Sequence, residues 1–449
     1  MLTFSGNYGI VSLIKKGGSS MRSERGEVRY VSKNGIELFV YPNSSIHSFQ
    51  LSLYLRSGSM HEVEEREHGI AHFFEHVAIR NVNRMRNGTL YSELDRLGVE
   101  FNATTYSELT QFYVGGAPKN FDFATGVLLD VLSPIILSKR EIDEERSRIK
   151  AEIRESDERT SLGLFTQSIV HGNTSLAHSI AGVPKSLNKL TKLTLEEYRR
   201  RSLVVGNFFF YATGNVTEEN VSHLLDMLDR LTVPTGKVNS NIAPVPGDFL
   251  KRETKVYIKN ADYTMARFTF DVDMNTITLA EGDLVYDAIL SGYNSEFFIE
   301  LSEKRGMLYD VSGSFERYGG SGTLSFSFEI KESELYEAAE VVADVLLRMK
   351  RELLPEEKCM RAVYVDNAYM LLDDARELNF TFAYDNHIMN AGYGSIEDRC
   401  NAYRAVSPER IRELSRLIFN TSGLTFTMKG SKKRIDVPRI LKALCKIDG

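Results

Sequence analysis

The sequence predicts an α+β fold made of two similar domains, and three observations support this prediction. Short segments with alternating apolar residues occur in groups, next to groups of longer segments with helical period, which is typical of α+β rather than doubly wound proteins. Landmarks of the first half recur in the second half at a nearly constant offset. A segment rich in proline and glycine separates the halves.

The elements of the first half follow from their hydrophobic periods. A period of two predicts strands at residues 36–41, 49–55 and 111–115. The helical period predicts helices at 69–79, 90–97, 121–132 and 138–155. Ser138 with Glu141 three residues later forms a capping box, so we expect the last of these helices to begin there.

Three pairs of segments predict an internal duplication. The alternating strand around Leu53 recurs around Phe268, an offset of 215. A helical segment at 129–132 recurs at 343–346, and aromatic strands end at Gly214 and at Gly430, with offsets of 214 and 216. One offset shared by three landmarks indicates a duplicated domain.

The break between the two domains is placed by Pro234, Pro244 and Pro246, which lie among glycines and small polar residues. We therefore predict an N-terminal extension at 1–27, a first domain at 28–233, a linker at 234–248 and a second domain at 249–449.

Composition excludes several classes of protein. The chain has 55 basic and 61 acidic residues and a net charge of −6, whereas a nucleic-acid-binding protein favours a basic face. No segment approaches the roughly 20 apolar residues of a membrane helix. Lys15 and Lys16 follow the apolar patch near the N-terminus, where a secretory signal carries its charge first. Three cysteines without close spacing make no disulfide framework, so we expect a cytoplasmic protein.

The segment His72-Phe-Phe-Glu75-His76 is the most informative part of the chain. On a helix, His72 and His76 lie one turn apart on the same face and can chelate one zinc ion. Glu75 borders that face and can reach water at the metal without being a ligand, as in the inverted HExxH motif. The competing interpretation is a pair of packed or capping histidines.

Two acidic residues of the helix at 138–155 are candidates for the same site. Glu145 and Glu152 are seven residues apart and share a face with Ile149, so we expect that face to point inward. Carboxylates that face a core need a cation, and a zinc ion supplies one. The competing interpretation is a solvated charged face.

These motifs, together with Phe101-Asn-Ala-Thr-Thr105 and Glu108, resemble the insulinase/pitrilysin superfamily of HxxEH zinc metallopeptidases. The resemblance covers about 400 residues and is closest to the short form, similar to mitochondrial processing peptidase subunits. It implies one zinc ion per chain, held by His72, His76 and Glu152. It also implies that Glu75 is the general base and that Glu145 orients a ligand.

The resemblance further implies that the two domains form half of a clamshell, which a second subunit closes into a chamber. Asn102, Ala103 and Thr104 would form an edge strand that binds an extended peptide through main-chain hydrogen bonds. At an offset of 215 the zinc ligands become Asp287, Ser291 and Asn367, so we expect no metal site in the second domain.

The chain departs from the family at one position. Active relatives carry an arginine seven residues before a tyrosine that reaches the scissile carbonyl, and here Ser302 precedes Tyr309. Nearby Arg305 is interpreted as structural. Tyr309 would stabilise the oxyanion in the site of the facing subunit. We therefore expect a homologous partner subunit that supplies the Arg/Tyr pair, or otherwise a homodimer.

The predicted function is a zinc metalloendopeptidase that cleaves short or unfolded peptides in a closed chamber, as the catalytic subunit of a dimeric, heterodimeric processing peptidase. Two alternatives stay open: a non-proteolytic assembly subunit that kept the fold, and a homodimeric scavenging peptidase. Maturation of a precursor and general peptide degradation are both compatible with the sequence.

Overall fold

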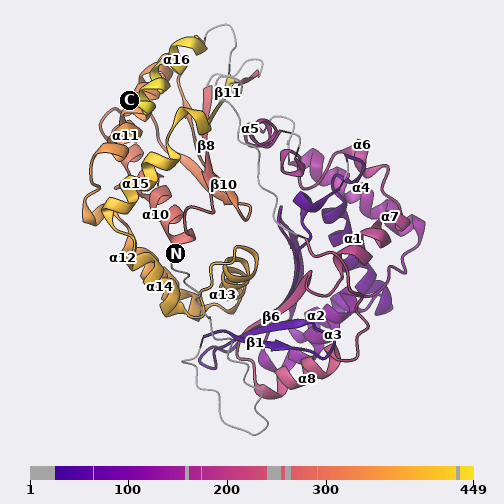
Figure 1. The fold of residues 1–449 in the computed structure, drawn as a ribbon. Coiled ribbons are helices and arrows are strands. Elements are labelled where there is room, and N and C mark those ends of the chain that lie inside the picture. The colour runs from indigo at the N-terminus through magenta and orange to yellow at the C-terminus, as the bar shows by residue number, and fades with distance from the viewer. Residues whose placement is uncertain are drawn as a thin grey trace, which may run out of the picture.

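The structure is a computed structural model, and it describes residues 26–63, 65–156, 161–172, 174–239, 254–257, 264–290, 292–430 and 435–449. Each half of the chain contains one sheet with helices packed on it (Figure 1). The first sheet has the strand order β1-β2-β6-β3-β5-β4, and the second has the order β7-β11-β8-β10-β9. The predicted α+β class is therefore confirmed.

The strands of the first sheet are β1 Val28–Val31, β2 Glu37–Pro42, β3 Phe49–Leu55, β4 Glu100–Thr105, β5 Thr110–Gly116 and β6 Phe208–Gly214. Those of the second sheet are β7 Thr254–Tyr257, β8 Thr264–Asp273, β9 Ser312–Arg317, β10 Ser321–Ile330 and β11 Leu424–Gly430. The helices before residue 240 are α1 Ile70–Met85, α2 Leu90–Leu97, α3 Phe121–Val131, α4 Lys139–Glu155, α5 Leu162–Val170, α6 Pro184–Leu187, α7 Lys192–Ser202 and α8 Glu218–Leu228. Those after residue 264 are α10 Leu279–Leu290, α11 Leu335–Arg351, α12 Arg361–Met370, α13 Ala375–Phe382, α14 Ile396–Arg404, α15 Pro408–Ile418 and α16 Val437–Leu444.

The register of the two sheets confirms the duplication. Leu53 of β3 pairs with Phe210 of β6 and Phe112 of β5. At the equivalent place Phe268 of β8 pairs with Phe426 of β11 and Phe326 of β10. The pairs β2–β6 and β7–β11 are both parallel. Apart from β1, which has no counterpart among the described strands of the second sheet, the two sheets share one strand order, sense and register and are equivalent structural units.

The two sheets turn one face each toward the other half, and helices cover the opposite faces (Figure 1). Apolar side chains of the first sheet pack with α1, α3, α7 and α8 in one core. Those of the second sheet pack with α10, α11, α15 and α16 in another. Each sheet therefore has one face packed against helices in its own core and one face turned toward the other half. This difference between the faces explains why apolar and polar residues alternate along the strands.

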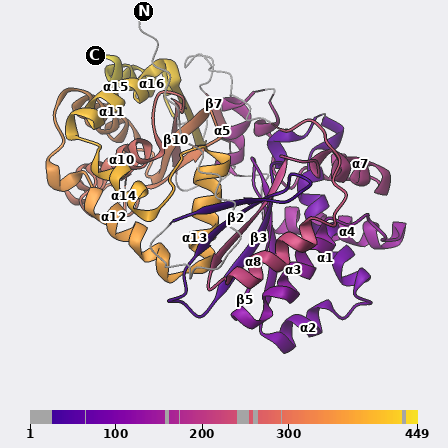
Figure 2. The ribbon, with the colours of Figure 1, turned by 60° about the horizontal axis from the view of Figure 1, so that its bottom comes forward.

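Each half also sends a helix onto the sheet of the other half. Helix α13, from the second half, packs on the inner face of the first sheet, where Asn379 accepts a hydrogen bond from the Tyr54 hydroxyl at 2.8 Å (Figures 1 and 2). Helix α5, from the first half, contacts the second sheet, where the hydroxyls of Thr166 and Thr427 are 2.6 Å apart. The halves are therefore joined by packing as well as by the chain.

Most predicted elements of the first half lie where the sequence placed them. The capping box of α4 is confirmed, because the Ser138 hydroxyl accepts the Glu141 N–H at 3.3 Å and the Glu141 carboxylate accepts the Ser138 N–H at 2.8 Å. Helix α1 is longer than predicted and ends at Met85, since Asn81 and Val82 are buried and continue its inner face.

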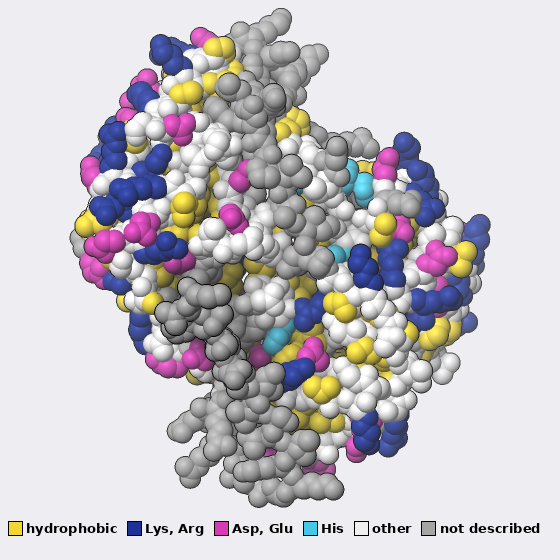
Figure 3. All heavy atoms as spheres, viewed as in Figure 1, with side chains coloured by type: hydrophobic (Ala, Val, Ile, Leu, Met, Phe, Trp, Pro, Cys, Tyr) yellow, Lys and Arg dark blue, Asp and Glu magenta, His cyan; other side chains and the backbone are white. Residues whose placement is uncertain are grey.

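Parts of the predicted domain division lie outside the described residues, namely 1–25 of the N-terminal extension and 240–248 of the linker. The described part of the linker, 234–239, has no regular structure and runs beside the first sheet, where Asn239 donates to the Asn207 side chain at 2.8 Å. None of the helices in the described ranges has the length and apolar character that a membrane span needs. On the face shown in Figure 3, basic and acidic side chains are interspersed over both halves.

Candidate metal centre

A buried carboxylate holds the N-terminus of α1, the helix that carries the histidines. Gly69 precedes the helix with a left-handed backbone (φ 90°) and has no side chain to cap it. Instead Glu62 accepts the N–H groups of Gly69 at 3.1 Å and of Ala71 at 3.2 Å. Burial raises the pKa of Glu62 to about 8, against the lowering effect of these hydrogen bonds. Glu62 was not identified from the sequence as the cap of α1. The signal in the sequence was an acidic residue shortly before the start of the helix, where a negative charge is stabilising.

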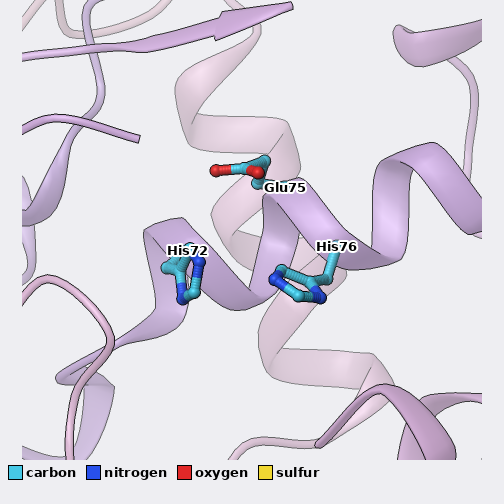
Figure 4. Close-up of side chains that lie close together, drawn as sticks. All are labelled: His72, Glu75 and His76. Carbon is cyan, nitrogen blue, oxygen red and sulfur yellow. The ribbon is translucent and has the colours of Figure 1, made fainter. Parts of the chain in front are cut away.

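His72 and His76 lie next to each other on one face of α1, as their spacing predicts (Figure 4). Their ring centroids are 4.7 Å apart and the rings are nearly perpendicular, at 80°. Glu75 extends from the adjacent side of the helix, and ligand atoms of these three residues lie within 4.8 Å of one another. The histidines are therefore not separate packing residues but neighbours in one cluster.

Glu152 of α4 completes a set of three ligands. Its Oε1 lies 3.7 Å from His72 Nε2, and its Oε2 lies 3.6 Å from His76 Nε2. With metal bonds of 2.0–2.1 Å, the ligand atoms of a tetrahedral zinc site are about 3.3 Å apart. Small side-chain movements would therefore bring the three groups onto one ion.

The chemistry of the three groups also fits zinc. Among the described residues, Glu152 forms no ion pair with Lys or Arg. Its contacts are with the imidazoles of His72 and His76. Burial lowers the pKa of His72 to about 4, which keeps that ring neutral, as a metal ligand must be. The buried Nδ1 of His72 has no hydrogen-bond partner in the described part of the chain. A divalent cation would balance the carboxylate and fix both rings.

Glu145 supports His76 from the side opposite to Glu152. Its side chain is only 2% exposed, and its Oε2 lies 3.6 Å from His76 Nδ1. Arg80 and Arg148 donate to its Oε1 at 2.7 and 2.9 Å. Burial lowers the pKa of His76, but the hydrogen bond to Glu145 and the surrounding carboxylates outweigh it and raise the pKa overall. A proton held on Nδ1 leaves Nε2 free for a metal.

The expectation that both carboxylates of α4 face inward is wrong for Glu152. Its side chain is 53% exposed, whereas Glu145 is buried. Both lie on the face of Ile149, but toward its C-terminal end α4 leaves the core and borders a cavity. The cations that compensate Glu145 are Arg80 and Arg148 rather than a metal.

Glu75 is nearly buried, with 8% of its surface exposed. The Thr105 hydroxyl donates to its Oε2 at 2.6 Å, which ties the carboxylate to the end of β4. Burial raises the pKa of Glu75, and the hydrogen bond from Thr105 opposes this effect. The group is thus both fixed in position and disposed to take up a proton.

The metal cluster, by which we mean His72, Glu75, His76 and Glu152, opens into a cavity of about 840 Å³ between the two halves. His72, Glu75 and Glu152 line it from one side, and Phe315, Arg317 and Tyr318 from the second half line it from another. Ala103 and Thr104 of β4 also face it. β4 is the last strand of the first sheet and pairs with β5 alone among the described strands, and Asn102 on it is exposed. The predicted edge strand therefore borders the metal cluster.

Tyr309 is not brought to the cluster of its own chain. Its side chain is 98% exposed, and it does not line the cavity. Ser302 lies in the short π-helix Phe298–Glu303 just before it. Arg305 donates to the main-chain oxygen and the carboxylate of Glu300 at 2.7 and 2.8 Å, which agrees with a structural role. In the described part of the chain, the group of three or more His, Cys, Asp or Glu residues with ligand atoms within 4.8 Å of one another is His72, Glu75 and His76, and Glu152 faces both of these histidines from α4.

Two family models match the chain, and together they cover most of it. Residues 38–182 match the insulinase (peptidase family M16) domain, and residues 189–363 match the peptidase M16 inactive domain. The chain belongs to the M16 peptidase family, whose members matched here include proteins named zinc proteases. The resemblance to the insulinase superfamily is confirmed.

The relatives and solved structures that match the chain cover it to different extents. The uncharacterized zinc protease YmxG of Bacillus subtilis is 19% identical over 408 residues, which are 87% of this chain and 95% of that protein. The β subunit of the mitochondrial-processing peptidase of Rattus norvegicus is 27% identical over 168 residues, 37% of this chain and 34% of that subunit. The structure of a protease from Helicobacter pylori matches with a TM-score of 0.79 at 16% identity, covering 90% of this chain and 99% of the other.

Proposed function

We propose that the chain is a zinc metalloendopeptidase that cleaves short or unfolded peptides, with one zinc ion held by His72, His76 and Glu152. The observation that carries this proposal is the position of Glu152, 3.6–3.7 Å from both adjacent histidines and beside the buried Glu75. The same cavity contains an edge strand that can bind extended peptide. A ligand set, a base and a peptide-binding edge in one cavity are the parts that peptide hydrolysis needs.

A zinc ion in this site supplies Lewis-acid activation of the peptide carbonyl and of water. Glu75 takes a proton from the attacking water and then gives a proton to the leaving amine. Glu145 keeps the His76 ring oriented. Main-chain groups of Asn102, Ala103 and Thr104 hold the substrate as an added strand.

We further propose that the chain works as a dimer, with a homologous partner subunit that supplies an Arg/Tyr pair. Ser302 replaces the arginine, and Tyr309 points into solvent, where a facing subunit can meet it. A relative named as a subunit supports an assembly. A homodimeric peptidase is the alternative, whereas a purely structural subunit has no use for the intact cluster. Three free cysteines suit the proposed cytoplasmic location.

The test is the Glu75→Gln variant. We expect it to keep one zinc ion per chain and to lose peptidase activity by about 10²–10⁴-fold, because only the proton acceptor is removed. Glu155→Gln, at the exposed end of the same α4 that carries Glu152, is the matched control and should change neither property. Elemental analysis that finds no zinc in wild-type protein from zinc-replete cells would overturn the metal assignment. Cleavage by Glu75→Gln at the wild-type rate would overturn the role of the base.

A further inference from the structure

A second cavity, of about 450 Å³, lies between α5 and the inner face of the second sheet. It shares Leu164, Gln167 and Glu316 with the cavity of the metal cluster, so the two spaces are contiguous. One extended peptide can therefore occupy both. The lining of this second cavity shows which chemical group it can accept.

The inner face of the second sheet is rich in hydroxyl groups. Alternate residues of β8 and β10, such as Phe268, Phe270 and Phe326, are buried in the core on the other side. The residues between them point to the inner face. Those with hydroxyls that line the cavity are Thr269 and Thr323, and Ser312 and Ser314 of the neighbouring β9 line it as well. Hydroxyl groups can donate hydrogen bonds to an anion although they carry no charge themselves.

Arg267 is the cation at the centre of this face. Its register neighbours are Ser327 on β10 and Thr427 on β11. Its Nη2 donates to the Ser325 hydroxyl at 2.6 Å, while its Nε is buried and has no hydrogen-bond partner among the described residues. The hydroxyl of Thr269, the next inward residue on β8, is also buried without a described partner.

Arg267 has no ion pair with any carboxylate of the described chain. The carboxylate that acts on it at longer range is Glu316, which accepts hydrogen bonds from Tyr318 and Ser314 instead. Burial lowers the pKa of Arg267, and the charge of Glu316 opposes this effect only in part. A buried charge without a partner is costly, and a bound anion would remove that cost.

We propose that this cavity binds a carboxylate of the peptide substrate, through the guanidinium of Arg267, which Ser325 holds in place, and the neighbouring hydroxyl of Thr269. A guanidinium matches a carboxylate with two parallel hydrogen bonds, which makes arginine selective for this group. The carboxylate comes either from the C-terminus of the peptide or from an Asp or Glu side chain. The inference rests on the proposed peptidase function and adds an anchoring point for its substrate.

The experiment measures binding, so it does not depend on catalysis. Zinc-loaded Glu75→Gln protein is titrated with three fluorescent peptides of one sequence without other acidic residues: one with a free C-terminal carboxylate, one with a C-terminal amide, and one amide with a single internal Glu. We expect one or both carboxylate peptides to bind about tenfold to a hundredfold more tightly than the plain amide. The peptide that gains affinity identifies the source of the carboxylate.

Arg267→Gln should remove this preference and leave binding of the plain amide unchanged, whereas Arg267→Lys, which keeps the charge, should retain part of it. Arg416→Gln, on α15 where the side chain is exposed and bonds to the Lys350 carbonyl, is the charge-matched control and should behave as the parent protein. A thermal melt checks the fold of each variant, and Arg267→Lys carries the test if Arg267→Gln does not fold.

Equal affinity for all three peptides, or a preference that is undiminished in every Arg267 variant that folds, would overturn the proposed anchor. The peptidase function fails separately: a protein that prefers carboxylate peptides but cleaves none keeps the anchor and loses the proposed function. Cleavage of acid and amide peptides with equal kcat/KM by wild-type protein keeps the function and removes the anchor.

Discussion

Glu145→Gln is the substitution that most directly tests how α4 supports the metal cluster. The carboxylate is 2% exposed and accepts hydrogen bonds from Arg80 and Arg148 while facing His76 Nδ1 at 3.6 Å. Removing its charge weakens two charge-assisted hydrogen bonds, and we expect a loss of about 2 kcal/mol in the free energy of unfolding of metal-free protein. It also loosens the orientation of His76, so we expect zinc affinity to fall by about 10–100-fold.

Glu144→Gln is the matched control, because Glu144 pairs with the same Arg80 but its side chain is 41% exposed and it forms no ion pair with a histidine of the described residues. Zinc affinity is measured by competition with a chelator at constant pH, and stability by urea unfolding of the metal-free proteins. Glu144→Gln should bind zinc like wild type. Unchanged zinc affinity in Glu145→Gln would refute the role of Glu145, and an equal loss in both variants would show that the effect passes through Arg80 instead.

Three further predictions address the helix cap, the missing arginine and the form of the substrate. The pKa of Glu62 is raised from 4.5 to about 8 in the folded protein. At a pH between these two values, the folded protein therefore keeps a proton on Glu62 that the unfolded chain has released. Wild-type stability should therefore fall with rising pH by up to about 1.4 kcal/mol per unit from pH 5 to 8, and Glu62→Gln, measured by urea unfolding, should lose this slope; parallel slopes would contradict the buried carboxyl. Ser302→Arg should raise the peptidase activity of the isolated chain, and the natural partner should raise it by about a hundredfold or more; high activity of wild type that no partner changes would disprove the missing pair. Unstructured peptides should be cleaved and stable folded domains should resist, as gel assays would show, because binding along β4 requires an extended chain; efficient cutting of a folded domain at a surface loop would contradict the enclosed site.

Local patterns predicted much of the fold and of the metal cluster. His72 and His76 converge because four residues make about one helical turn, and the sequence contains that spacing. The shared offset of the two halves appears in the sheets as the same strand pairs, Leu53 with Phe210 and Phe268 with Phe426. In each case the information lies within a few neighbouring residues or in one repeated period.

Contacts between distant segments were not predictable in this way. Asn379 of α13 bonds to the first sheet, and Thr166 of α5 meets the second, although chain order assigns each helix to the other half. Glu62 caps α1 from outside the helix, and Glu152 proves half-exposed because α4 runs out of the core. None of these features has a periodic signal in the sequence.

By itself, the sequence determined the class of fold, the duplication and the pair of neighbouring histidines with Glu75, because short-range periods and spacings depend on backbone geometry that is the same in every helix and strand. The tertiary structure alone decided which half covers which sheet, which carboxylate is buried beside His76, and that Arg267 lies in a cavity next to the cluster without an ion pair to any carboxylate of the described residues. Burial and charge pairing depend on segments hundreds of residues apart, and only their packing brings those segments together.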